Sequence, residues 1–161
     1  MKVYHGSTYI VEKPELILSS AGRDFGIGFY TTEIEQQAVK WAKRVARIRR
    51  KKEAFLNIYD FDNENTDRFV CVKSFDGYSM EWLDLIVACR HDSKYRHGYD
   101  IVTGKIANDD VGETVQAVVD GLTPKDFALT KLTYMSANNQ ICFCSKAALS
   151  FLRFIRAERL A

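Results

Sequence analysis

The chain has 161 residues, of which 47% are hydrophobic and 27% are charged, and its formal net charge is only +2. These values are typical of one globular domain, which we expect to span residues 1–161. No apolar run is long enough to cross a bilayer and no signal-like segment opens the chain, so we expect a cytoplasmic protein with no membrane partner. The cysteines lack Cys-x-x-Cys spacing, which favours buried reduced thiols over a metal site.

Hydrophobic periodicity predicts strands and helices that do not alternate strictly, and this mixture indicates an α+β fold. Turn residues and alternating β-branched or aromatic residues define the strands, and apolar residues at helical intervals define the helices. In chain order, the predicted elements are strands at 2–6 and 28–32, a helix at 33–52, strands at 55–61 and 69–75, a helix at 79–91, a strand at 100–107, helices at 110–119 and 125–134, a strand at 140–145 and a closing helix at 146–160.

The helix predicted after residue 32 has a clear start and an apolar stripe. Thr32 and Glu35 have the spacing of a Thr-x-x-Glu capping box. The stripe includes Trp41, which we expect to point inward and to pack beside Tyr30. Its simplest alternative is an ordinary core residue.

Two short segments carry the chemistry: Val3–Ser7, and Asp24–Thr32 with its Gly-x-Gly-Phe-Tyr sequence. A histidine at the end of a strand can orient a ribose hydroxyl, and the glycine after it lets the backbone approach a flat carboxamide. Tyr30 and Trp41 could hold a pyridinium ring by stacking and cation–π attraction, each worth about 0.5 to 2 kcal/mol. His5 could instead be a core histidine. Arg23, just before the second segment, could meet a pyrophosphate or have no ligand.

These segments resemble the ADP-ribosyltransferase superfamily, in the clade named for a His-Tyr-Glu triad that includes poly-ADP-ribose polymerases and diphtheria toxin. His5-Gly6-Ser7, the Gly26–Tyr30 strand and Trp41 match that pattern. The late segment Asn139–Phe143 is similar to the family's Asn-Glu strand, with Gln140 where the glutamate normally stands. Nearly end to end, the chain also resembles a family of short bacterial proteins in this superfamily that share Tyr-His-Gly-Ser and Asp-Phe-Gly-x-Gly-Phe-Tyr.

The resemblance implies two antiparallel sheets packed at a steep angle, with flanking helices and NAD in the cleft between the sheets. It implies NAD as the ADP-ribose donor, a protein or nucleic-acid acceptor, and a toxin or effector setting with a small antitoxin partner. The catalytic residues would be His5, Tyr30 and Gln140. The residues that would bind NAD are His5, Gly6, Ser7, Arg23, Tyr30 and Trp41.

Gln140 decides between two kinds of function. A glutamine keeps the hydrogen bond to the ribose but cannot act as a base, which favours transfer of a single ADP-ribose over chain elongation. On that basis Gln140→Glu should hold or raise the rate. The alternative is a catalytically inactive NAD-cleft module that binds a nucleotide or a partner protein. A missing carboxylate could also come from Asp100 or Asp109, which otherwise read as a strand end and a helix cap.

The basic residues between Lys43 and Lys52 leave the acceptor open. Cations at a helix C-terminus are often only a solvated face. Otherwise this surface could hold a nucleic acid or an acidic protein.

Overall fold

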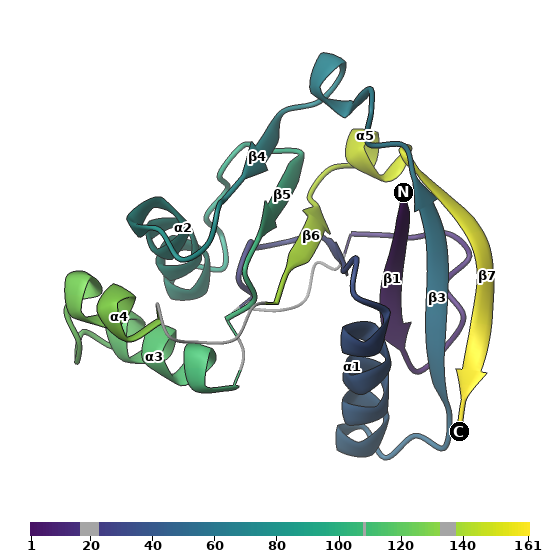
Figure 1. Ribbon diagram of the computed structural model, residues 1–161, viewed down its shortest axis with the longest axis horizontal. Coiled ribbons are helices and arrows are strands. Elements are labelled where there is room, and N and C mark those ends of the chain that lie inside the picture. Colours follow the sequence, from purple (N-terminus) through teal and green to yellow (C-terminus); the bar gives the residue numbers. More distant parts are fainter. Residues whose placement is uncertain (17–22, 108, 133–137) are drawn as a thin grey trace.

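The computed structural model describes residues 1–16, 23–107, 109–132 and 138–161, with the side chain of Asp109 outside that description. Strands and helices are combined around two separate sheets, so the predicted α+β class is confirmed (Figure 1). No helix in these ranges is both long enough and apolar enough to cross a membrane.

The first sheet is antiparallel throughout and has the order β1-β3-β7. It consists of β1 (Lys2–Ser7), β3 (Ala54–Phe61) and β7 (Leu152–Leu160). Central β3 is buried along most of its length, with only Phe55 and Asp60 partly exposed. Such a strand needs partners on both edges, which β1 and β7 provide.

The second sheet has the order β2-β6-β5-β4. It consists of β2 (Phe29–Thr31), β6 (Gln140–Phe143), β5 (Ile101–Gly104) and β4 (Val72–Ser74). Strands β4 and β5 are parallel, so the expectation of two fully antiparallel sheets is wrong for this pair. The segment between them contains the helix α2 (Met80–His91), the kind of crossover that a parallel pair requires.

The two sheets meet where β1 approaches β2. The backbone N–H of Tyr4 donates to the carbonyl oxygen of Thr32 at 2.8 Å, and the N–H of Thr32 donates back to Tyr4 at 3.0 Å. We call this contact between β1 and β2 the sheet junction. It places β1, β2 and β6 side by side, although they come from opposite ends of the sequence.

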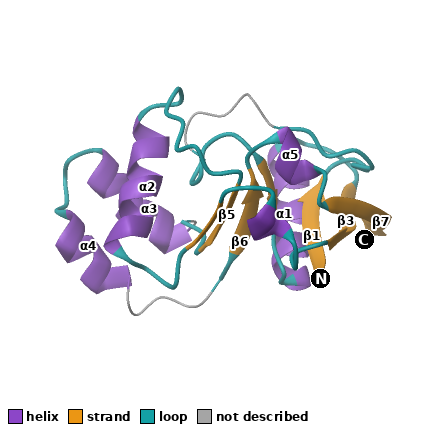
Figure 2. Cartoon of the chain, turned by 90° about the horizontal axis from the view of Figure 1, so that it is seen from above, coloured by secondary structure: helices purple, strands orange, loops and turns teal. Residues whose placement is uncertain are grey.

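The helices cover different sides of the two sheets (Figure 2). Helix α1 (Glu35–Ile48) packs on β1 and β3, whereas α2, α3 (Asp109–Val119) and α4 (Lys125–Leu132) lie together beside the second sheet. The short η1 (Thr66–Arg68) and α5 (Lys146–Leu149) lie in connections.

Two main cores hold these layers. Phe29, Phe143 and Ile101 of the second sheet pack with Val3 and Tyr59 of the first, so these side chains fill the space between the sheets. A larger cluster around Phe25 and Trp82 lies between the second sheet and helices α2–α4. A ligand therefore has no room between the packed faces at these residues, and the sheet junction is the place to look for a site.

Helix α1 begins and faces differently from the prediction. Its N-cap residue is Ile34, which has no side-chain cap, and the hydroxyl of Thr32 accepts from the N–H of Ile34 instead of closing a capping box. Trp41 is 46% exposed. The buried residues of α1 are small, namely Ala38, Ala42 and Ala46. The helix lies so close to β1 that only small side chains fit between them. The side that faces the sheet is therefore the one with the smallest side chains, not the one with the largest apolar ones.

The end of the chain is the largest departure from the expected elements. Ser145 caps the start of α5 by accepting from the N–H of Ala148, but this helix ends at Leu149 instead of continuing to residue 160. Residues 152–160 form β7 instead of continuing the helix, because they pair along all of β3. The strand expected at 69–75 is also shorter, since only Val72–Ser74 pair with β5.

Candidate functional site

His5 is tied to β2 through its ring. Its Nδ1 lies 2.7 Å from the carbonyl oxygen of Tyr30. A carbonyl oxygen only accepts hydrogen bonds, so Nδ1 carries the proton. Burial lowers the pKa of His5 to about 4, helped by the charge of Arg23 and opposed by the bond to Tyr30. The ring is therefore neutral at pH 7, and Nε2 is an acceptor with no partner among the described residues.

Tyr30 presents its ring rather than its hydroxyl. The hydroxyl donates to the carbonyl oxygen of Gly26 at 2.6 Å and accepts from the N–H of Phe25 at 3.1 Å, which closes the turn before β2. Burial raises the pKa of Tyr30 well above its ordinary value. The guanidinium carbon of Arg23 lies 5.2 Å from the ring centroid, within cation–π distance. One face of this ring already interacts with a cation.

Gln140 begins β6 and is only 6% exposed. Its Nε2 donates to Oδ2 of Asp24 at 3.0 Å and to the carbonyl oxygen of Lys105 at 3.4 Å. Both partners only accept, which fixes the orientation of the side-chain amide. The amide oxygen Oε1 therefore points away from these groups and has no partner within the described ranges.

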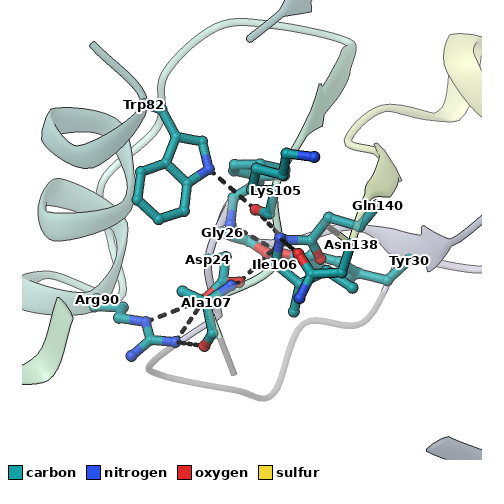
Figure 3. A network of polar contacts seen from close by, with 11 residues as sticks. Asp24, Gly26, Tyr30, Trp82, Arg90, Lys105, Ile106, Ala107, Asn138 and Gln140 are labelled. Atoms are coloured by element: carbon teal, nitrogen blue, oxygen red, sulfur yellow. Dashed lines mark hydrogen bonds and ion pairs between the residues drawn. The ribbon is translucent and has the colours of Figure 1, made fainter. Parts of the chain in front are cut away.

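Asp24 is the centre of the buried network around Gln140 (Figure 3). Its Oδ1 accepts from Nε and Nη2 of Arg90 at 3.1 and 2.6 Å. Its Oδ2 accepts from the backbone N–H of Ala107 at 2.8 Å as well as from Gln140. Arg90 also donates to the carbonyl oxygen of Ala107 at 2.7 Å. This network places the carboxylate of Asp24, paired with Arg90, directly behind the amide of Gln140.

The sequence prediction did not identify Asp24 or Arg90 as site residues. Arg90 lies in the last turn of α2, on the face that also carries buried Leu83 and Ile86. An arginine on the apolar face of a helix is buried and needs a buried hydrogen-bond acceptor, so the position of Arg90 in the sequence already indicates such a partner. Its partner cannot be read from that signal, because Asp24 lies 66 residues away along the chain.

Register places Tyr30 and Gln140 on one face of the second sheet. Tyr30 lies directly opposite Cys142 in the β2–β6 pair, and Gln140 is two residues from Cys142 on the same strand. His5 reaches this pair from β1 across the sheet junction. The three predicted catalytic residues are thus brought together on neighbouring strands.

Gly6 and Ser7 have roles within the fold. A Cβ on Gly6 would lie 2.2 Å from the carbonyl oxygen of Ala38 and 2.8 Å from the N–H nitrogen of Ala42, so this glycine allows the close approach of α1. The hydroxyl of Ser7 donates to the carbonyl oxygen of Tyr9 and accepts from Nδ2 of Asn57 at 3.3 Å. Both residues shape the chain beside His5.

Trp41 does not form the predicted pair with Tyr30. It is exposed on α1, and no aromatic ring contact within the described ranges involves it. Its distance from the core follows from the alanine face of α1, which turns the larger side chains outward. We therefore leave Trp41 out of the candidate site.

The two alternative carboxylates lie just before β5 and at the start of α3. Oδ2 of Asp100 accepts from the N–H of Cys71 at 2.8 Å, which is the strand-end role. Asp100 precedes β5, four residues from the Gly104 that pairs with Gln140, and is therefore about 13 Å away along the strand. Asp109 begins α3, and its side chain lies outside the described part of the chain.

Two open hollows lie elsewhere on the surface. One, of about 570 Å³, is lined by residues from Asp60–Glu64 and Ser150–Arg153, and the other, of about 200 Å³, lies beside α2 at Lys73, Tyr95 and His97. None of His5, Tyr30 and Gln140 lines either hollow. The candidate site rests on its hydrogen-bond geometry and not on a cavity.

A family model described as a protein of unknown function, DUF3990, matches residues 1–154. The chain belongs to this family. The region of the DUF3990 match contains β1, β2 and β6, and with them His5, Tyr30 and Gln140. No curated protein and no solved structure matches the chain.

Proposed function

We propose that this protein is an NAD-dependent mono-ADP-ribosyltransferase with its site at the sheet junction. The observation that carries the proposal is the convergence of His5, Tyr30 and Gln140 on adjacent strands, with the ring of His5 bonded to the backbone of Tyr30 at 2.7 Å. These residues come from positions 5, 30 and 140 of the sequence, and the sheet junction brings their strands together.

His5 and Gln140 supply two acceptors of fixed orientation. Nε2 of neutral His5 and Oε1 of Gln140 each lack a partner among the described residues, while the opposite atom of each group is held in place. Sugar hydroxyls are the natural donors to such acceptors. In the proposed site, His5 orients one ribose of NAD and Gln140 holds the hydroxyl of the ribose that reacts.

Tyr30 and Arg23 mark the place for the nicotinamide. The ring of Tyr30 already interacts with the guanidinium of Arg23 at 5.2 Å, so its face attracts planar cations. A pyridinium would take this position or the opposite face of the ring. Arg23, once displaced, is close enough to His5 to influence its pKa and could meet a phosphate group.

Asp24 supplies the charge that Gln140 lacks. In the reaction, the bond between ribose C1′ and the nicotinamide nitrogen breaks with its electron pair going to nitrogen, and positive charge develops on the ribose. The acceptor forms the new bond to C1′ and loses its proton to solvent. The Asp24 carboxylate, 3.0 Å behind the Gln140 amide, polarises Oε1 toward that charge.

The product of this chemistry is a single transferred ADP-ribose. Chain elongation needs a base that activates an incoming ribose hydroxyl, but Gln140 carries no carboxylate, and the carboxylate of Asp24 already accepts hydrogen bonds from Arg90, Ala107 and Gln140. The steep-angled sheets of an ADP-ribosyltransferase and a toxin with a small antitoxin remain expectations of the sequence resemblance.

The test combines NAD binding with transfer. Purified protein is titrated with NAD by calorimetry and then incubated with NAD labelled in its adenylate phosphate and a bacterial lysate. Digestion with protease, DNase or RNase identifies the acceptor. Gln140→Ala should lose most transfer while NAD affinity changes little, because its bond strengthens as the ribose becomes cationic. Gln116→Ala, at an exposed glutamine of α3, is the matched control.

Two other outcomes would distinguish an active transferase from the alternatives. Binding of NAD without transfer by the wild type would favour the inactive nucleotide-binding module. A folded protein that binds no NAD at millimolar concentration would overturn the proposal altogether.

The structure reverses the expectation for Gln140→Glu. A glutamate there would place a second carboxylate about 3 Å from Oδ2 of Asp24, and two carboxylates this close do not both ionise. We expect Gln140→Glu to lose stability and to transfer more slowly at pH 7 than the wild type. Equal or faster transfer would show that Asp24 is not in contact with residue 140 during the reaction.

A further inference from the structure

The outward surface of α1 and the residues after it carry a concentration of positive charge. Eight of the 23 basic residues lie between Gln36 and Lys52, and this stretch contains no acidic residue. The formal net charge of the whole chain is only +2, so the rest of the chain is net negative. All eight side chains are exposed: Lys40, Lys43, Arg44, Arg47, Arg49, Arg50, Lys51 and Lys52.

An aromatic ring lies within this basic surface. Trp41 is 46% exposed, whereas the other tryptophan, Trp82, is fully buried. At 100° per residue, Trp41 shares one line of the helix with Gln37, Arg44 and Ile48, along the edge of the exposed face. We call this line the Trp41 row. A large indole among cations has no partner ring within the described ranges.

The Trp41 row starts at the candidate site. Nε2 of Gln37 donates to the carbonyl oxygen of Asn139 at 2.8 Å, and Asn139 directly precedes Gln140. Trp41 follows one turn further along α1, and Arg44 and Ile48 follow after it. A polymer lying on this row would be led toward Gln140 at one end.

The composition of the row decides which polymer fits. Large apolar residues recur every seven positions at Ile34, Trp41 and Ile48, and all three are exposed. The positions three residues after each of them are polar Gln37, Arg44 and Lys51, and those four residues after the first two are buried Ala38 and half-buried Val45. A partner helix needs an exposed apolar seam at both core positions of the heptad, and here only the first carries exposed apolar residues. Phosphates satisfy the cations, and unpaired bases stack on an indole, so a single strand uses both features.

We propose that the exposed face of α1, centred on the Trp41 row, binds single-stranded nucleic acid. The strand's phosphates contact the cations of residues 40–52 and one base stacks on Trp41. That the bound strand is also the ADP-ribose acceptor rests on the function proposed above, but binding itself does not, and it is measured without NAD.

The experiment measures binding of labelled single-stranded oligonucleotides, of DNA and of RNA, by fluorescence anisotropy at several salt concentrations. Affinity should fall steeply with salt, since each neutralised phosphate adds about −0.7 to the slope for a single strand. Tryptophan fluorescence should be quenched on binding, because only Trp41 of the two indoles is exposed. A duplex of the same sequence should bind more weakly.

Matched variants separate the contribution of Trp41 to oligonucleotide affinity from that of the basic residues. Trp41→Ala should weaken single-strand binding roughly tenfold or more and leave the salt slope unchanged. Phe127→Ala removes another exposed aromatic residue, on α4, and should have no effect. Lys40→Ala with Arg47→Ala should weaken binding and lower the salt slope. Arg153→Ala with Arg156→Ala makes the same charge change on β7, where both arginines pair with acids, and should do neither.

Three results would overturn the proposal. One is no binding at low salt by folded protein. Another is equal binding of single strand and duplex with no effect of Trp41→Ala, which would leave only unspecific charge attraction. The last is equally tight binding of poly-glutamate that competes with the oligonucleotide, which would identify a surface for acidic proteins.

Discussion

Asp24→Asn tests the buried network in its most sensitive place. The carboxylate accepts four hydrogen bonds, two from Arg90, one from the N–H of Ala107 and one from Gln140. Asparagine keeps the shape of the side chain but replaces one acceptor oxygen with an NH₂ group. Whichever way the new amide turns, one pair of donors faces another donor.

The loss of stability in Asp24→Asn comes from the charge of Arg90, which stays buried without its partner. The side chain of Arg90 is only 13% exposed, and Asp24 is its only ion-pair partner among the described residues. Removing one member of a buried pair costs about 3 to 5 kcal/mol, because the other charge stays desolvated. Domains of this size have about 5 to 15 kcal/mol in total. Asp24→Asn should therefore fold at 25 °C but unfold at a clearly lower denaturant concentration.

Urea unfolding, followed by circular dichroism, measures this loss in Asp24→Asn, Arg90→Met and the double variant. The double variant should lose less than the sum of the single losses, since it leaves no unpaired charge. Asp84→Asn breaks the exposed pair with Lys125 and should cost less than about 1 kcal/mol. A loss below about 1 kcal/mol for Asp24→Asn, with additive single effects, would refute the reasoning.

Further predictions concern single side chains. Burial lowers the pKa of His5 from 6.5 to about 4, so the unfolded chain takes up the proton first as the pH falls. The free energy of unfolding should therefore fall by about 3 kcal/mol as the pH drops from about 6.5 to about 4. Urea unfolding of His5→Asn over the same pH range should lack this decrease. An equal decrease in the wild type and in His5→Asn would contradict the prediction. Gly6→Ala forces a Cβ against the carbonyl oxygen of Ala38 and should cost about 2 to 3 kcal/mol in the same assay. A loss below about 1 kcal/mol for Gly6→Ala would speak against this packing. The Cys142 thiol and His97 lower the pKa of Cys144 to about 6 against the effect of burial. Iodoacetamide labelling of Cys144, followed by peptide mass spectrometry, should thus level off near about pH 7. A rate that keeps rising steeply to higher pH would disprove a thiolate at neutrality.

Local patterns in the sequence were sufficient for some elements. Strand β3 and helix α2 lie where hydrophobic periodicity predicts them. Residues 152–160 were predicted as a helix and form a strand, because pairing with all eight residues of β3 outweighs helical propensity. Pairing partners more than ninety residues away are not encoded in a local pattern.

In the candidate site too, local motifs predicted some residues, whereas tertiary contacts decided the rest. The motifs around His5, Tyr30 and Gln140 predicted which residues would gather, and the strand order brings them onto neighbouring strands. Trp41 was misplaced because the inner face of α1 is set by its contact with Gly6, where only alanine side chains fit. The sequence offered Asp100 and Asp109 as sources of the missing carboxylate, whereas in the structure the carboxylate in contact with Gln140 is that of Asp24. That contact depends on Arg90 and on the tertiary arrangement of α2.

The sheet junction also bears on how the protein opens. The hydrogen bonds that connect β1 to the β2 segment in the described residues are the reciprocal pair of Tyr4 with Thr32 and the bond from the ring of His5 to Tyr30, and β2 itself has three residues. Such a short strand is a natural place for local unfolding, in which the sheets separate before either one melts. In amide hydrogen exchange, Tyr4 and Thr32 should exchange together and earlier than the central residues of β3. A ligand that contacts both His5 and Gln140 would slow exchange at both amides at once, since it would close the sheets on each other.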